Sequence, residues 1–196
     1  MQLLMQWVIQ TIQLYNAKLI FSTTKNLKMR PTKIITVNPR EGQDLSVVGD
    51  NYRLLITGKE TENAFAVIDM LIPPGGGPMP HAHATFQESF YVIEGEIVVR
   101  TEQQTYVAKQ GAFVSIPKGG AIHSFKNETD SITHILCIVV AAGLEEFFKE
   151  IGQPVAYGEF LPPPVMNASD AARLKTIAEK YNQEVFPPGY FEQKKH

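Results

Sequence analysis

The first part of the chain, residues 1–32, carries apolar side chains at helical spacing. They recur in steps of three or four residues, which predicts one apolar helix stripe: Leu4, Val8, Ile12, Tyr15 and Leu19. Glutamine and asparagine interrupt the segment too often for a membrane span, and no clear signal peptide is present. A peripheral helix, an amphipathic leader and a translation start set too early, with Met29 as the true beginning, all stay open.

Residues 33–142 have a different sequence pattern, in which short apolar runs are separated by Gly, Pro, Asn and Asp about every ten residues. This spacing is typical of an all-β sandwich or barrel. Hairpin turns are expected at Glu94-Gly95 and at residues 102–104. The predicted strands are Lys33–Val37, Tyr52–Thr57, Phe65–Ile72, Phe90–Ile93, Glu96–Thr101, Tyr106–Lys109, Phe113–Ile116, Ile122–Lys126 and Thr133–Ala141.

Residues 143–196 are predicted to be a helical extension packed on the β domain. A first helix is expected from Leu144 to Ile151, because Gly152 is a suitable stop. A proline-rich connector follows, and Ser169 or Asn167 can cap a second helix that runs from Asp170 to about residue 181.

Composition and charge exclude several classes of protein. The 196 residues are 44% hydrophobic and 19% charged, which is ordinary for one globular domain with decorations and excludes a disordered or collagen-like chain. The formal net charge of -2 provides no basic field for nucleic acid or for an anionic membrane. The single cysteine, Cys137, makes no intramolecular disulfide, so a cytoplasmic location is expected.

Candidate metal ligands lie close together in the β region. His81 and His83 alternate, so on an extended segment both imidazoles face the same side. Glu88 is five residues past His83, and a turn through residues 84–87 is needed to bring it back to that side. His123 is the candidate fourth ligand. Such a donor set suits one divalent transition metal per chain (Fe, Ni, Mn, Co, Cu or Zn) and does not suit Ca or Mg.

These residues carry a resemblance to the cupin superfamily. Residues 75–95 resemble the first cupin motif, G-x5-H-x-H-x4-E-x6-G. The matching residues are Gly75, His81, His83, Glu88 and Gly95. The second motif resembles the positions Gly111, Pro117, Gly119, His123 and Asn127. One residue more than in the motif separates Gly119 from His123. The resemblance implies an all-β double-stranded β-helix, the cupin jelly-roll barrel, with a metal held by His81, His83, Glu88 and His123.

A weaker resemblance concerns the single-domain, quercetin-dioxygenase-like cupins, whose C-terminal extension is similar to the Leu144–Ile151 helix and the proline-containing segment after it. It implies a metal-dependent dioxygenase acting on a small enol or flavonol-like substrate, with Glu88 as the catalytic residue that helps take the substrate's proton. A non-catalytic binding or sensing cupin with a structural metal is the alternative. Decarboxylation or isomerisation ranks last, because only Arg53 and Arg100 offer cations on strands that could face the lumen.

Several apolar residues are candidates for lining a substrate pocket, although each is also a natural core residue: Phe65, Phe90, Phe113, Phe125 and Phe147. Cys137 is expected in the core, and His134 as a hydrogen-bonded strand residue that is not a fifth ligand. The expected partners are a small-molecule substrate, dioxygen if the protein is an oxygenase, and a second copy of the chain in a homodimer, with neither nucleic acid nor membrane.

Overall fold

The computed structural model describes residues 34–193 together with Gln6 and Gln10. Both glutamines are helical and exposed, and the whole apolar stripe predicted in residues 1–32 lies outside the described residues. The chain divides into two compact units, residues 1–36 and residues 37–196. No helix in the described part of the chain is long and apolar enough to cross a membrane.

The larger of two sheets has seven strands in the order β11-β1-β2-β3-β10-β5-β8, and every neighbouring pair is antiparallel. Their bounds are β1 Gln43–Val47, β2 Asp50–Ile56, β3 Ala66–Ile72, β5 Gln87–Glu94, β8 Phe113–Ile116, β10 Thr133–Val140 and β11 Gln153–Pro154. Strand β10 is buried at alternate positions, from Thr133 to Val139. This alternation places one face of the strand on the core and leaves the other face partly in solvent.

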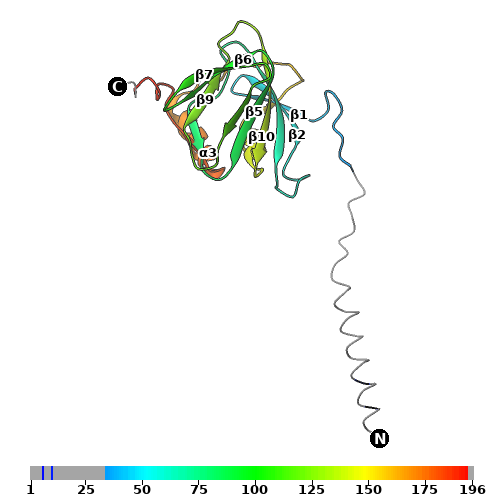
Figure 1. Ribbon diagram of the computed structural model, residues 1–196. Coiled ribbons are helices and arrows are strands. Elements are labelled where there is room, and N and C mark those ends of the chain that lie inside the picture. The colour runs from blue at the N-terminus through cyan, green and yellow to red at the C-terminus, as the bar shows by residue number, and fades with distance from the viewer. Residues whose placement is uncertain (1–5, 7–9, 11–33, 194–196) are drawn as a thin grey trace. The chain divides into compact units, whose positions relative to one another are not determined.

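The smaller sheet has five strands in the order β12-β4-β9-β6-β7. Their bounds are β4 His81–His83, β6 Glu96–Thr101, β7 Thr105–Lys109, β9 His123–Lys126 and β12 Gln183–Val185. Strands β6, β7 and β9 lie together in one layer, and β1, β2, β5 and β10 lie in the other (Figure 1). The apolar core fills the space between the layers, as the contact between the rings of Phe90 on β5 and Phe125 on β9 illustrates. This is the predicted all-β jelly-roll cupin fold.

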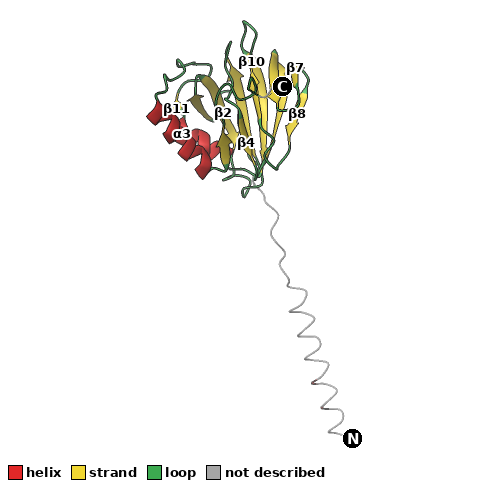
Figure 2. Cartoon of the chain, turned by 90° about the vertical axis from the view of Figure 1, so that its left-hand side faces the viewer, coloured by secondary structure: helices red, strands yellow, loops and turns green. Residues whose placement is uncertain are grey.

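Two helices come after β10 in the chain and pack on one side of the strands (Figure 2). Helix α2 spans Leu144–Ile151, as predicted, and its Phe148 ring meets Tyr52 of β2 edge-on. Helix α3 spans Ala168–Lys180. Asn167 caps it by accepting hydrogen bonds from the backbone N–H groups of residues 169 and 170. Of the two predicted caps, Asn167 is therefore the one in use.

Three parts of the strand prediction were wrong. Residues 34–37 are not a strand, and the first strand among the described residues is β1, which contains too few consecutive apolar residues to stand out. Glu94-Gly95 is not a hairpin turn, because β5 and β6 belong to different sheets and the chain passes between the layers there. The short strands β11 and β12 were missed. The turn at residues 102–104 is confirmed, since β6 pairs with β7 and the Thr101 N–H donates to the Gln104 carbonyl at 2.9 Å.

Candidate metal centre

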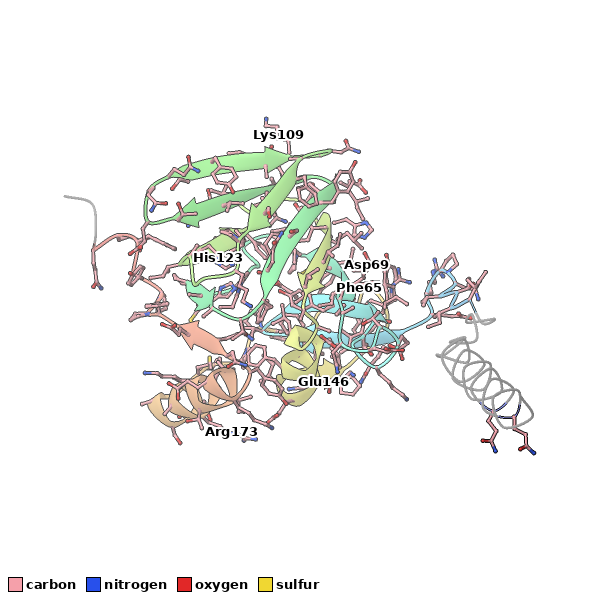
Figure 3. The ribbon with its side chains drawn as sticks, turned by 60° about the horizontal axis from the view of Figure 1, so that its bottom comes forward. Phe65, Asp69, Lys109, His123, Glu146 and Arg173 are labelled. Carbon is pink, nitrogen blue, oxygen red and sulfur yellow. The ribbon has the colours of Figure 1, made fainter. Side chains whose placement is uncertain are left out.

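The four candidate ligands come from both sheets. His81 and His83 lie on β4, and β4 pairs with β9 so that His81 is directly opposite His123. Glu88 comes from β5, in the other sheet. The chain bends at residues 84–85 as it crosses between the layers, which is the turn that the spacing required. The site thus lies between the sheets, and Figure 3 shows His123 in the interior of the domain, with Lys109 and Arg173 pointing outward.

The ligand atoms converge on one point. The Oε2 atom of Glu88 is 3.3 Å from Nε2 of His83, 3.3 Å from Nε2 of His123 and 4.0 Å from Nε2 of His81. One ligand atom from each of the four residues can be chosen so that all lie within 4.8 Å of one another. A tetrahedral or octahedral metal with bonds of about 2.0–2.2 Å to nitrogen and oxygen separates its ligand atoms by roughly 3–4.5 Å. The spacing therefore fits a single ion.

Each imidazole is oriented by a backbone carbonyl. Nδ1 of His81 lies 2.9 Å from the carbonyl oxygen of Met79, and Nδ1 of His123 lies 2.9 Å from that of Ala121. Nδ1 of His83 lies 3.1 Å from the carbonyl oxygen of Phe86. A carbonyl only accepts hydrogen bonds, so each Nδ1 carries a proton and leaves Nε2, on the side of Glu88, as the atom that a metal could bind. This second layer of hydrogen bonds is the arrangement typical of metal-ligating histidines.

Burial sets the charge of the site. Burial and the neighbouring imidazole of His123 lower the pKa of His81 to about 3, so this ring is neutral at neutral pH. Burial alone would raise the pKa of the Glu88 carboxyl, but hydrogen bonds with His123 and His83 outweigh it and hold that pKa below its usual range. The carboxylate and the three Nε2 atoms lie close together, and a bound cation could accept an electron pair from each of them. The donor set therefore fits a transition-metal ion.

The extra residue between Gly119 and His123 does not displace the fourth ligand. Gly119 and Gly120 both adopt positive φ, 122° and 87°, which glycine adopts without steric cost. The turn absorbs the additional residue there, and His123 still pairs with His81 across the sheet.

A cavity of about 130 Å³ adjoins the centre and is lined mainly by apolar side chains. His81 and Glu88 form part of its wall, as do Phe125 and Phe147, two of the five phenylalanines proposed for the pocket. The other three do not line it. Phe90 is buried in the core at 1% exposure, whereas Phe65 and Phe113 are 40% and 60% exposed. Phe65 lies just before β3, and alternation along β8 turns the Phe113 side chain away from the interior.

Cys137 and His134 occupy the expected places. Cys137 is fully buried, and its thiol donates a hydrogen bond to Oε1 of Glu88 at 3.5 Å. Burial and the Glu88 charge raise the pKa of the thiol, so it stays protonated. His134 pairs with Asp69 and is not part of the candidate centre. The proximity of Cys137 to Glu88 could not be foreseen, because 49 residues separate them.

Three polar residues of the cavity wall were missed in the sequence: Asp50, Tyr52 and Gln183. All three are at least nine-tenths buried. No motif marks them, and only the pairing of β2 with β3 and of β12 with β4 brings them to the site. A possible signal was Asp50, a charged residue between the apolar runs of β1 and β2.

Comparison with known proteins agrees with this fold and site. Residues 68–139 match the family model described as Cupin domain, a range that contains all four candidate ligands. This part of the chain is a cupin domain.

Two known proteins are similar to parts of this chain. A quercetin 2,3-dioxygenase from Bacillus subtilis (strain 168) is 27% identical over 114 residues, which are 58% of this chain and 33% of that protein. The chain thus aligns with about a third of the length of this relative. A crystal structure of a predicted oxalate decarboxylase from Thermotoga maritima superimposes with a TM-score of 0.51 at 19% identity, covering 55% of this chain and 99% of that one. This second likeness shows the fold alone.

Proposed function

We propose that the protein is a metal-dependent dioxygenase that acts on a small enol. The observation that carries this proposal is the convergence of three imidazoles and one carboxylate at the wall of an apolar cavity. The similarity to a quercetin 2,3-dioxygenase supports the reaction class.

The roles of the residues follow from their geometry. His81, His83, His123 and Glu88 would hold one divalent transition metal, which when bound supplies a site for a substrate oxygen and redox chemistry with dioxygen. Glu88 is ionised and lies in the cavity wall, so its carboxylate can accept the hydroxyl proton of an enol. Phe125, Phe147 and Phe148 surround the bound molecule with apolar surface and exclude water from it.

The cavity volume favours a compact substrate. Its 130 Å³ is close to the roughly 150 Å³ of an apolar cavity that accommodates benzene. A one-ring enol is therefore the proposed substrate class, and a three-ring flavonol would also occupy the mouth of the cavity. Among the residues that the structure describes, no lysine or arginine lines the cavity. Arg53 pairs with Asp69 and Arg100 with Glu128, so the features expected for a small-acid decarboxylase or isomerase lack support.

The same geometry would serve a binding or sensing cupin with a structural metal, which is the second candidate. Both candidates take a small molecule as partner, and the oxygenase also takes dioxygen. We further propose that the protein is cytoplasmic, on the strength of its single, buried and reduced cysteine.

The deciding experiment combines metal content with dioxygen uptake. Protein purified without an affinity metal column is subjected to elemental analysis, beside His81→Ala and the matched control His134→Ala. We expect about one Fe, Ni, Co, Mn or Cu per chain in the wild type and the control, and at least tenfold less in His81→Ala. Dioxygen uptake is then followed with maltol, a one-ring hydroxy ketone, and with quercetin.

The outcomes separate the candidates. Dioxygen uptake that depends on His81 supports the oxygenase. Metal and a co-purified small molecule without uptake favour the binding cupin. Equal metal content in wild type and His81→Ala would remove the metal centre altogether.

A further inference from the structure

One wall of the cavity is built by the chain after the cupin domain. Helices α2 and α3 and strand β12 all contribute lining side chains, and all three lie beyond residue 139, where the family match ends. Substrate selectivity can therefore come from a part of the chain that the cupin motifs do not describe.

Strand β12 is hydrogen-bonded to β4, the strand that carries His81 and His83. It pairs antiparallel with β4, which places Gln183 opposite His83 and Val185 opposite His81. The Phe186 N–H donates to the Pro80 carbonyl at 2.9 Å and extends this pairing by one further bond. A side chain on β12 is thus held in a defined position relative to the metal ligands.

Gln183 is a buried polar residue whose amide nitrogen is unpaired within the part of the chain that the structure describes. Its side chain lines the cavity, the residue is only 5% exposed, and its Nε2 atom has no hydrogen-bond partner among the described residues. A buried amide left unpaired costs stability, so native proteins rarely keep one that no ligand or water satisfies. An amide can rotate to present either its N–H group or its oxygen to a bound molecule.

Asp50 is a second residue of this kind in the cavity wall. It is 3% exposed, and its Oδ2 atom accepts a hydrogen bond from the Tyr52 hydroxyl at 3.0 Å. Its Oδ1 atom, like Nε2 of Gln183, has no hydrogen-bond partner among the described residues. An otherwise apolar cavity therefore holds two unsatisfied polar side chains besides the candidate metal ligands.

We propose that Gln183 and Asp50 bind the polar groups of the substrate, with Gln183 as a specificity-determining residue supplied by the C-terminal extension. The proposal rests on the proposed function in taking the substrate's reacting oxygen to lie at the metal centre. The ligand class is then a compact, mostly apolar enol with at least one further hydroxyl or carbonyl oxygen. Gln183 hydrogen-bonds a carbonyl or hydroxyl oxygen, and Asp50 hydrogen-bonds a hydroxyl.

The test separates this role from a structural one. Gln183→Met keeps the length of the side chain and removes the amide, and Gln110→Met makes the same change at an exposed site that does not line the cavity. Maltol and quercetin are titrated by calorimetry without dioxygen into the protein as purified, whose metal content is measured in parallel. Melting temperatures without ligand are also compared. Asp50→Asn, which keeps a partner for Tyr52, is tested in the same way.

We expect Gln183→Met to bind the better of the two probes about tenfold more weakly than wild type, which corresponds to one lost buried hydrogen bond. Its metal content should be unchanged, and its melting temperature equal or higher, because the substitution removes an unsatisfied polar group. Gln110→Met should bind like the wild type. Asp50→Asn should also weaken binding.

Equal affinity of wild type and Gln183→Met would overturn the inference, even if dioxygen uptake proves the oxygenase. A lower melting temperature in Gln183→Met with unchanged affinity would mean that the amide is structural. Binding that depends on Gln183 without dioxygen uptake would keep the inference and overturn the oxygenase. Failure of both probes to bind the wild type would overturn the inference and the enol substrate class together.

Discussion

The chemistry of the centre depends on one side chain with two proposed roles. Glu88 is both a candidate metal ligand and the candidate base. Its Oε2 atom faces the imidazoles, and its Oε1 atom accepts a hydrogen bond from the Cys137 thiol. Each of the three histidines has only one proposed role, metal binding through Nε2, because its Nδ1 atom is already hydrogen-bonded to a backbone carbonyl. Changes at Glu88 should therefore separate metal binding from turnover, whereas changes at the histidines should not.

Glu88→Gln tests the role of the carboxylate. The amide keeps an oxygen that can bind the metal but cannot take up a proton, so we expect most of the metal to remain. Turnover should fall by about 10²–10⁴-fold, the usual contribution of a general base. Elemental analysis and dioxygen uptake check the two parts. Full activity in the variant would exclude Glu88 from the mechanism.

Asp50 should make the stability of the protein depend on pH. Burial raises the pKa of its carboxyl to about 7, and the hydrogen bond from the Tyr52 hydroxyl offsets part of the rise. The folded state therefore holds a proton that the unfolded state releases above its ordinary pKa near 4. The contribution of Asp50 to stability is complete below pH 4 and is lost as the pH rises to about 7.

Asp50→Asn removes this titration. The melting temperature of the variant relative to wild type should increase by several degrees between pH 4 and pH 8. Scanning calorimetry on metal-free protein at both pH values measures the difference, and Asp130→Asn, at an exposed site, is the control. A constant difference between variant and wild type would show that Asp50 titrates normally.

Among the strands and turns, a close contact between a glycine-rich segment and β9 positions one of the candidate ligands. The segment Gly75–Gly77 runs beside β9, with the Gly75 N–H donating to the Asn127 carbonyl at 2.8 Å. Gly77 has φ of 121°, and a Cβ atom there would lie 2.2 Å from the Phe125 carbonyl oxygen. This close approach holds β9, and with it His123, against the rest of the site.

Gly77→Ala should displace β9 and lower the metal content as well as the stability. The matched control is Gly75→Ala, where φ is also positive, at 78°, but a Cβ atom meets nothing within 4 Å. The control should cost about 1–2 kcal/mol through backbone strain alone. Gly77→Ala should cost more, because a backbone oxygen must also move. Denaturant unfolding and elemental analysis compare the two, and equal losses would mean that the close approach does not position His123.

At the scale of the whole molecule, we propose a homodimer. Its support is an exposed apolar group on the outer face of the larger sheet, where Tyr91 of β5 is paired with Phe113 of β8 and both side chains are more than a third exposed. Light scattering should give twice the mass of the chain, and Phe113→Ser should shift the mass toward the monomer. The monomer mass for the wild type would contradict the proposal.

The strands were predicted to different degrees for physical reasons. Runs such as β3 and β10 were found because they are long and rich in β-branched residues. Strand β1 was missed because its sequence, Gln-Asp-Leu-Ser-Val, has only two apolar side chains. The hairpin expected at Gly95 was wrong because a turn signal shows where the chain reverses or bends and does not show which strands then pair.

The candidate ligands could be named from the sequence because metal coordination constrains their types and spacing. His81, His83, Glu88 and His123 were all chosen before the fold was known, and the structure brings these four residues together. The pocket was predicted less well. Phe65 and Phe113 are exposed, since an aromatic residue type alone shows neither where a strand begins, as at Phe65, nor which face of a strand it occupies, as at Phe113.

Several features could be predicted from the residues alone: the all-β class, the cupin motifs, the helix at Leu144–Ile151 and the candidate metal ligands. These features depend on local spacing and on the chemistry of residue types, which the order of residues records directly. Only the tertiary structure decided that Glu88 faces the histidines from the opposite sheet and that Asp50 and Gln183, 133 positions apart, line the same cavity. Such contacts depend on how strands pair across the domain, and no local pattern contains that pairing.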